Sequence, residues 1–242
     1  MNKYFNPVER IELYSDTIGD KGYVELWSGW NSDFNKESRA ETITTVASLS
    51  YGNEAAKDPD SLIKVLENKK HLVPFEFVRF SDEFNFNLRN FNDLNYMDIS
   101  PNEHGKRYFA HFKFKIPLFA DAHFMTHRCY SRLAMSRRFT SGDKVPFEFY
   151  ATNGYELRAG EDFVGIYNMR IKNGEKKEDA RSTMPVNTYT VRFACADKYG
   201  LKNFFKQRLA ADTQKQTREL AEAMLKLLQN HQPELYQFIM ED

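Results

Sequence analysis

The sequence predicts a mixed α/β (α+β) fold in a single domain that spans residues 1–242. Three observations support this prediction. A chain of 242 residues has the usual size of one large domain. Hydrophobic residues make up 41% of the chain, with 21 Phe and 13 Tyr, which is enough to bury a sizeable core. Segments with the two-residue period of strands are interspersed with helix-type segments, and no repeat or low-complexity linker divides them.

Strand-type patterns occupy four segments: 22–30, 74–88, 108–119 and 182–196. In 108–119, Phe109, His111 and Lys113 alternate with Ala110 and Phe112, so we expect a half-buried strand. In 182–196, Met184 precedes a proline and should be extended.

Helix-type patterns occupy several other segments. Ser38 followed by Glu41 forms a capping box for a helix over 38–52, and the acidic start of 58–72 suits the positive end of a helix. Residues 120–139 lack Gly and Pro and predict a helix, broken near its middle. A long helix is expected over 202–228, with a short one after Pro233. The charged, Gly-containing segments 152–177 and 91–107 predict an exposed hairpin and a surface excursion.

Composition and the N-terminal sequence indicate in which compartment the protein works and which partners it does not bind. The first sixteen residues lack an apolar run with a cleavage site, and no window approaches the length of a membrane span. Cys129 and Cys195 are the two cysteines, which suits a reducing cytoplasm. Lys+Arg and Asp+Glu balance at 34 each, so the chain has no overall attraction to nucleic acid or to an anionic membrane. We expect a cytoplasmic protein that binds neither.

One stretch, Thr126–Thr140 ("THRCYSRLAMSRRFT"), concentrates one His, four Arg and two Ser without a carboxylate. At helical spacing His127, Ser131 and Arg138 would share a face that could hold phosphate through Arg forks and Ser hydroxyls. A solvated basic face explains the same residues. The phosphate loops G-x-x-x-x-G-K-[ST] and G-x-G-x-x-G are absent from the chain.

Three other interpretations of this stretch stay open. His123 and His127 have a spacing that can place two imidazoles on one metal, but no third ligand follows, so we predict no metal site. Cys129 could be a nucleophile activated by its cationic neighbours. Tyr130 and Phe139 could stack on the bases of a single-stranded nucleic acid.

The order of residues in this stretch resembles the signature of the flavin-dependent thymidylate synthase family, R-H-R-x-x-S-x-N-E-x-S-x-R-Y. His127, Arg128, Ser131, Ser136 and Arg138 match it in register. Thr126, Leu133 and Ala134 stand where the signature has Arg, Asn and Glu, and Phe139 replaces Tyr. The chain therefore resembles a divergent member with an altered signature.

Further blocks resemble the family in the right order. "KKHLVPFEFVRF" (69–80) is similar to H-x-[ST]-P-F-E-H, with Val73 in place of the hydroxyl residue. Residues 112–128 resemble the strand that leads into the signature, and "ARSTMP" (180–185) resembles A-R-x-x-L-P. "NFFKQRLAADTQKQTRELA" (203–221) is similar to the family's C-terminal block. Residues 81–107 look like an insertion.

The resemblance implies a curved antiparallel sheet flanked by helices, in a homotetramer with active sites at subunit interfaces. It implies transfer of a one-carbon unit from methylenetetrahydrofolate to C5 of a pyrimidine deoxynucleotide, dUMP giving dTMP. FAD reduced by NADPH would supply the hydride, and no cysteine nucleophile would be needed.

The resemblance also implies roles for individual residues. The flavin would be held by His71, His127, Arg128 and Arg208. The nucleotide would be held by His123, Ser136, Arg138, Arg181 and Arg218. Arg218 would be catalytic because a permanently charged guanidinium can stabilise the anion that develops on the pyrimidine.

The departures from the signature bear on the substrate. Thr126 removes a cation, Leu133 an amide and Ala134 a carboxylate, while the anion-binding Ser136 and Arg138 remain. Losing one such hydrogen bond costs about 1–3 kcal/mol, enough to change substrate preference. Two alternatives are therefore kept: the same scaffold acting on dCMP or another pyrimidine nucleotide, by methylation or hydroxymethylation, and an inactive nucleotide-binding descendant.

Overall fold

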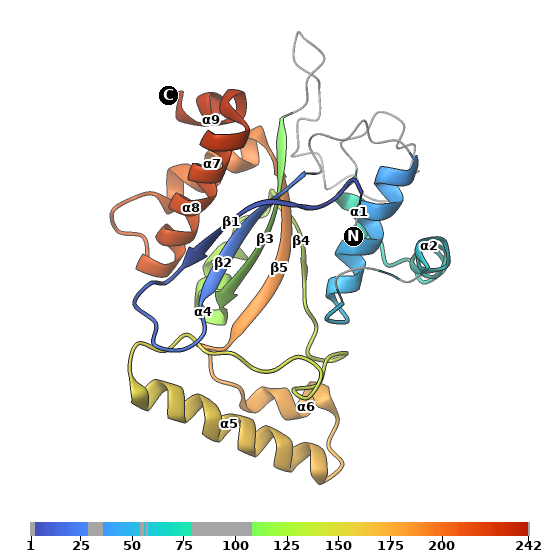
Figure 1. Ribbon diagram of the computed structural model, residues 1–242, viewed down its shortest axis with the longest axis vertical. Helices are drawn as coiled ribbons and strands as arrows, with labels where there is room; N and C mark the ends of the chain where they lie inside the picture. The colour runs from blue at the N-terminus through green and yellow to red at the C-terminus, as the bar shows by residue number, and fades with distance from the viewer. Residues whose placement is uncertain (1–2, 29–35, 54–55, 57, 79–107, 242) are drawn as a thin grey trace.

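A computed structural model of the chain describes residues 3–28, 36–53, 56, 58–78 and 108–241. Its centre is an antiparallel sheet with the strand order β1-β2-β3-β5-β4 (Figure 1). The strands are β1 (Pro7–Leu13), β2 (Gly22–Trp27), β3 (Phe109–Pro117), β4 (Ser131–Ala134) and β5 (Tyr189–Asp197). The predicted α/β class with an antiparallel sheet is confirmed.

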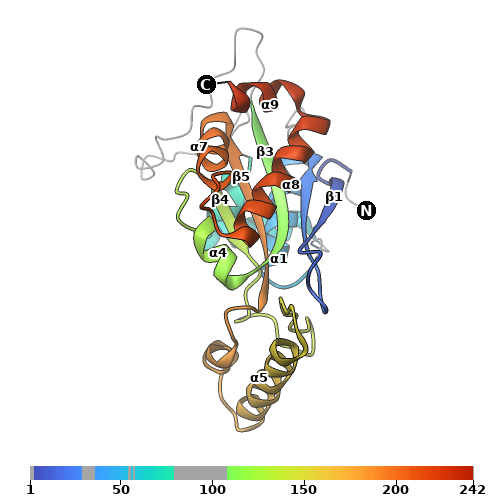
Figure 2. The same cartoon turned by 90° about the vertical axis from the view of Figure 1, so that its left-hand side faces the viewer.

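Helices cover both faces of the sheet. On one face lie α4 (Leu118–Phe124), α7 (Lys198–Arg208), α8 (Lys215–His231) and α9 (Pro233–Met240). On the other lie α1 (Lys36–Leu49), α2 (Pro59–Asn68) and α3 (Val73–Glu76). Beyond one end of the strands lie α5 (Gly154–Lys172), α6 (Lys177–Ala180) and a 3-10 turn, Arg181–Thr183. The two helical layers and the separate position of α5 are visible in Figures 1 and 2.

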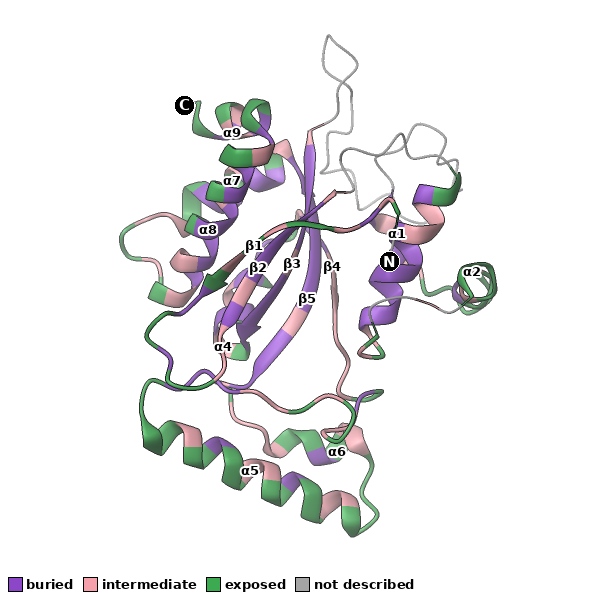
Figure 3. Cartoon of the chain, viewed as in Figure 1, coloured by how far each residue is buried: buried purple, intermediate pink, exposed green. Residues whose placement is uncertain are grey.

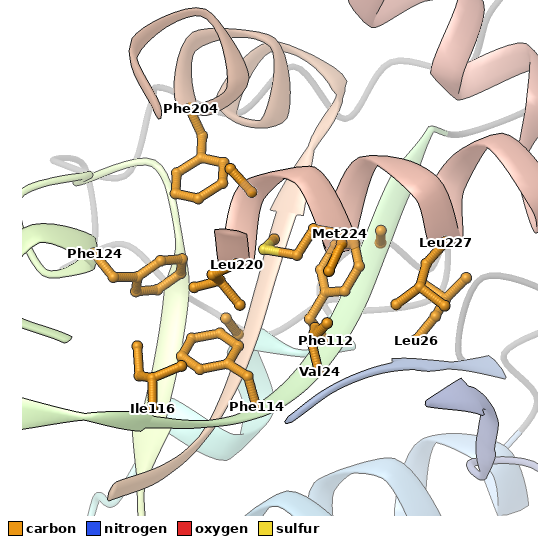
Figure 4. Close-up of a cluster of buried hydrophobic side chains, with 14 of the residues drawn as sticks. Val24, Leu26, Phe112, Phe114, Ile116, Phe124, Phe204, Leu220, Met224 and Leu227 are labelled. Atoms are coloured by element: carbon orange, nitrogen blue, oxygen red, sulfur yellow. The ribbon is translucent and has the colours of Figure 1, made fainter. Parts of the chain in front are cut away.

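The larger core lies between the sheet and α8. Val24 and Phe112 of the strands pack with Leu220, Met224 and Leu227 of α8, all fully buried (Figure 4). A second cluster on the opposite face joins the sheet to α1 and to Phe77, which follows α3. Figure 3 shows that the strands and much of α1 are buried. Burial of this much apolar area on both faces is the main driving force for the fold.

The central strand β3 is buried on both faces, so the expectation of a half-buried strand is wrong. His111, predicted on its polar side, is fully buried, and its Nε2 donates a 2.8 Å hydrogen bond to the carbonyl of Phe77. Lys115 is nearly buried and pairs with Glu148 at 2.8 Å. A strand that lies between two helical layers has no solvent-exposed face, even when polar and apolar residues alternate in its sequence.

Several predicted elements are confirmed. Strands occur at β2 and β5, Met184 is extended, and α9 begins at Pro233. Asp58 caps α2 by accepting from the amide of Ser61. The helix predicted over 38–52 is α1, which leads into a turn at Gly52, but Ser38 lies inside the helix rather than at its cap.

The helix predicted over 120–139 is wrong in its second half. The segment forms the short α4, a turn and then β4, which pairs with β5 from Ser131↔Cys195 to Ala134↔Arg192. Pairing with a strand almost sixty residues away outweighs local helix propensity. The proposed helical face of His127, Ser131 and Arg138 therefore does not exist.

The exposed hairpin predicted over 152–177 is also wrong, because α5 occupies most of it. Asn153 caps α5 by accepting from the amides of Tyr155 and Glu156. Gly160 is a packing residue rather than a turn residue: a Cβ there would lie 2.7 Å from the ring of Phe149. The helix is mostly exposed, as Figure 3 shows.

Two further predictions need correction. The single long helix over 202–228 is two helices, α7 and α8, separated by a turn whose Thr213 hydroxyl donates to the carbonyl of Gln207. The strand predicted over 74–88 begins instead with the helical turn α3, where Pro74 sits in the first turn. Phe77 and Val78 form a turn after α3, and the rest of that segment, the excursion at 91–107 and the insertion at 81–107 lie outside the described residues.

No helix in the described ranges has the length and apolarity that crossing a bilayer requires.

Candidate functional site

The segment Thr126–Arg128 turns tightly between α4 and β4. The amide of His127 donates to the carbonyl of Phe124 at 3.1 Å, and the Thr126 hydroxyl donates to the carbonyl of His123 at 2.8 Å. Arg132, the second residue of β4, donates to the carbonyls of Met125 and His127 at 2.8 and 3.0 Å. These bonds hold the backbone of the turn that carries His127.

The His127 ring meets Arg208 at the end of α7. Arg208 Nε donates to His127 Nε2 at 2.7 Å, and Arg208 Nη2 donates to the Thr126 hydroxyl at 2.9 Å. Because a guanidinium can only donate, Nε2 must accept, and the neutral ring carries its proton on Nδ1. His127 and Arg208, which are 81 positions apart, are thus in direct contact. The family resemblance implies that both hold the flavin.

The environment keeps His127 neutral. Burial, and then the charges of Arg208 and Arg132, lower the pKa of His127 to about 4. A ring that is neutral throughout the physiological range can accept a hydrogen bond or orient a ligand, but it cannot supply a proton as an imidazolium acid.

Neighbouring signature residues on β4 face opposite layers, because side chains alternate along a strand. Leu133, paired with Phe193, packs with the cluster on the α1 face. Ala134, paired with Arg192, faces the α4 side, where Asp121 receives two hydrogen bonds from Arg192 at 2.8 and 2.6 Å. In the sequence the two substitutions were grouped as departures from one signature, whereas in the fold they have different neighbours.

Leu133 lines a pocket of about 360 Å³ between α1 and the loop before α3. His71, Val73 and Pro74 of the predicted flavin block also line it. The full lining is Ala47, Ser50, Tyr51, Leu66, Lys70, His71, Leu72, Val73, Pro74, Leu133 and Phe139. The rings of Tyr51 and Phe139 lie 4.9 Å apart at its edge, and both are partly exposed. This apolar pocket with a basic rim suits a planar ring system.

The predicted phosphate-binding residues gather near α6. Arg138 Nε lies 2.7 Å from a carboxylate oxygen of Glu178, and Arg181 Nε donates to the Glu178 carbonyl at 3.3 Å. Ser136 Oγ accepts from the amide of Arg138 at 3.3 Å. Arg138 is largely exposed, so its ion pair with Glu178 is a weak one that an anion could displace.

The other predicted residues lie around the α4–α8 contact. Arg218 donates to the Ala211 carbonyl at 2.9 Å and lies 3.8 Å from Glu222. His123 Nδ1 lies 3.5 Å from the Thr217 hydroxyl, one residue before Arg218. Arg128 is exposed. Arg218 is therefore near His123 in the fold but turned toward the loop before α8.

The remaining chemical interpretations gain no support. Burial and the charge of Asp197 raise the pKa of the Cys129 thiol, which opposes activation as a nucleophile. Cys195 is fully buried in β5. In the part of the chain that the structure describes, no group of three or more His, Cys, Asp or Glu could hold a metal ion.

Sequence reasoning missed Arg132, Asp121, Arg192 and Glu178. Arg132 occupies a variable position of the signature, and its role as a brace appears only once the turn and β4 replace the expected helix. Asp121 and Arg192 are 71 residues apart, and no local pattern links them. Of these four residues, Glu178 alone had a local signal in the sequence, because it lies three residues before Arg181, a predicted nucleotide ligand.

The fold and the site define a class of protein: an α/β protein in which a basic segment contacts an arginine near the C-terminus, and in which an apolar pocket lies against the strand that follows this segment. Comparison with known proteins gives the family. The family described as thymidylate synthase complementing protein matches residues 34–234. The chain belongs to this family, and it is a flavin-dependent thymidylate synthase-like enzyme.

Curated relatives agree with this assignment. A flavin-dependent thymidylate synthase of Thermus thermophilus is 23% identical over 239 residues, covering 88% of this chain and 74% of the relative. That of Treponema denticola is 24% identical over 245 residues, covering 88% and 77%. That of Ehrlichia ruminantium is 25% identical over 241 residues, covering 97% and 75%.

Proposed function

We propose that the chain transfers a one-carbon unit from methylenetetrahydrofolate to C5 of a pyrimidine deoxynucleotide, with dUMP giving dTMP as the first reaction to test. FAD is the proposed cofactor, and NADPH is the proposed reductant. The observation that carries the proposal is the 2.7 Å contact between His127 of the signature and Arg208 of the C-terminal block. A solvated basic face would not bury a histidine against an arginine from another element.

The pocket beside His71 is the proposed place for one ring system of the flavin. Its volume of about 360 Å³ is near the lower end of ligand pockets, and its lining is mostly apolar. When bound, the flavin would supply hydride chemistry. The residues of this chain would hold it: Tyr51 and Phe139 by stacking, His71 at the rim, and Arg128 with the His127–Arg208 pair beyond β4.

The nucleotide would be bound through its phosphate and its ring. Ser136, Arg138 and Arg181 are the proposed phosphate ligands, with the Arg138–Glu178 pair opening to admit the anion. His123 and Arg218 are the proposed ring contacts. Arg218 would stabilise negative charge on the pyrimidine as C5 becomes nucleophilic, because its own charge does not depend on pH.

A homotetramer is the proposed assembly. Within one chain, the proposed phosphate ligands Arg138 and Arg181 lie with α6 beyond the strand ends, whereas the proposed ring contacts His123 and Arg218 lie on α4 and α8 (Figure 1). We infer that one nucleotide contacts both groups when they come from different copies of the chain. Sedimentation equilibrium should then give a mass about four times the chain's 28.5 kDa; a monomer at micromolar concentration would contradict this part.

The proposed activity is tested by release of tritium from C5-labelled dUMP in the presence of FAD, NADPH and methylenetetrahydrofolate. Arg138→Gln and Arg181→Gln should weaken nucleotide binding with the fold intact, because both side chains are exposed. Arg158→Gln, an exposed arginine on α5, is the matched control. Purified protein that binds no flavin and releases no tritium would refute the proposal.

A second candidate substrate, dCMP, rests on the departures from the signature: Thr126, Leu133 and Ala134 stand where it has a cation, an amide and a carboxylate. Parallel assays with C5-labelled dCMP decide between the two: release from dCMP alone would move the function to modified cytosine, with methyl or hydroxymethyl product identified by mass spectrometry. Binding of either nucleotide without release would indicate the inactive descendant.

A further inference from the structure

A buried ion pair lies against the signature strand. Asp121 on α4 accepts hydrogen bonds from Nε and Nη2 of Arg192 at 2.8 and 2.6 Å, one on each carboxylate oxygen. The two side chains are 8% and 9% exposed. Such a bidentate pair is geometrically specific. The family resemblance implies no role for either residue.

The residue paired with Arg192 across the sheet is Ala134, one of the departures from the signature. Ala134 is the register partner of Arg192 in the β4–β5 ladder, so both side chains lie on the same face and are lateral neighbours. The family signature has Glu at this position. A chain with Ala134 and a buried Arg192 needs a counter-charge from elsewhere, since an uncompensated buried guanidinium is strongly destabilising.

We propose that Asp121 is the relocated carboxylate of the site: it supplies from α4 the negative charge that the signature places on β4, and it positions the Thr126–Arg128 segment through that charge. Asp121 is nearly buried, so it acts through Arg192 and the backbone and does not touch substrate. It is a positioning residue.

The path from Asp121 to the site is short. The Asp121 carbonyl accepts from the amide of Met125 at 2.8 Å, and Arg132 donates to the carbonyls of Met125 and His127. Arg132 and Arg192 repel each other, while Asp121 attracts both. Without the Asp121 charge, Arg132 and Arg192 lose the carboxylate that attracts both and repel each other. Because Arg132 holds the turn at His127, we expect the His127 ring to shift relative to Arg208.

The first experiment needs no ligand and compares urea midpoints of the whole chain. Asp121→Asn should lower the midpoint, and Asp121→Asn with Ala134→Glu should recover it. The same background with Ala134→Gln, equal in volume but uncharged, should not recover. Glu175→Gln, which removes the carboxylate of an ion pair on the surface, should leave the midpoint unchanged.

Two results would overturn the relocation. One is an unchanged midpoint for Asp121→Asn, which would mean that Arg192 needs no counter-charge. The other is equal recovery by Glu and Gln at position 134, which would mean that volume rather than charge matters there.

The second experiment separates positioning from bracing and rests on the proposed function. Asp121→Leu with Arg192→Leu should keep the midpoint, because apolar replacement of a buried pair is often tolerated. Its affinity for FAD, measured by flavin fluorescence, should fall roughly tenfold as the site geometry shifts. Unchanged affinity would mean that the pair only stabilises the fold and does not position the site. Absence of FAD binding by the unaltered chain would refute the proposed function, while the urea comparison would still decide the relocation.

Discussion

At the scale of single residues, Thr126 illustrates how a departure from the signature can be accommodated. The signature has Arg here, but the Thr126 hydroxyl accepts a hydrogen bond from Arg208. An arginine side chain can only donate and could not take this role. The threonine thus places a hydrogen-bond acceptor beside Arg208 where the signature has a second cation.

The His127–Arg208 contact makes a spectroscopic prediction. In Arg208→Gln the pKa of His127 should rise from about 4, because one of the nearby charges that depress it is gone. It should stay below the ordinary value because burial is the largest cause and remains. NMR titration of the imidazole measures this. Arg218→Gln is the control and should leave the His127 pKa where it is; an equal shift in both variants would contradict the assignment.

Phe139 gives a second prediction at this scale. The side chain is 45% exposed and faces Tyr51 at the pocket edge. Phe139→Ala should weaken FAD binding about tenfold, a typical loss for one stacking surface, with little change in melting temperature. Tyr155→Ala, which removes an exposed ring from α5, is the matched control. Fluorescence titration with FAD gives both affinities, and equal values would remove Phe139 from the site.

At the scale of elements, α5 shows how a glycine can be misinterpreted. Gly160 and Gly165 lie in the same exposed helix, but a Cβ at Gly160 would meet the Phe149 ring at 2.7 Å, and nothing lies within 4 Å at Gly165. Gly165→Ala should stabilise the fold by about 0.5–1 kcal/mol through helix propensity. Gly160→Ala should destabilise it by about 1–3 kcal/mol through overpacking. Urea unfolding of the pair tests this, and a shared sign would show that α5 is not packed as described.

The elements that sequence alone predicted correctly are those with local signals. Strands β3 and β5 have long aromatic or β-branched runs, and Asp58 with Pro59 announces the start of α2. The helix predicted over 120–139 failed in its second half because β4 exists only through its pairing with β5, which no local pattern contains. For the same reason the site was predicted as a set of residues, while its contacts, such as His127 with Arg208, were not.

At the scale of the whole molecule, two buried histidines couple the fold to pH. Burial lowers the pKa of His111 to about 4, and His127 has a similar value. In the unfolded chain both should titrate near the ordinary value of about 6.5. Between these values the unfolded state binds protons that the folded state does not, so stability is full above about pH 6.5 and falls as pH decreases toward 4.

The expected slope is about 1.4 kcal/mol per pH unit for each histidine. The free energy of unfolding, measured in urea from pH 7 to pH 4.5, should therefore fall by about twice that per unit from these two groups. His127→Gln keeps an acceptor for Arg208 and should remove half of the histidine contribution. A slope that does not change in this variant would mean that His127 is already protonated in the fold.

The alternation of β4 also has an evolutionary meaning. Leu133 and Ala134 are adjacent in the chain but belong to different layers, one beside the pocket and the other beside Arg192. The effect of a mutation at either position therefore depends on a separate set of neighbouring residues. A substitution at one position leaves the neighbours of the other unchanged, so the two departures from the signature need not have arisen together.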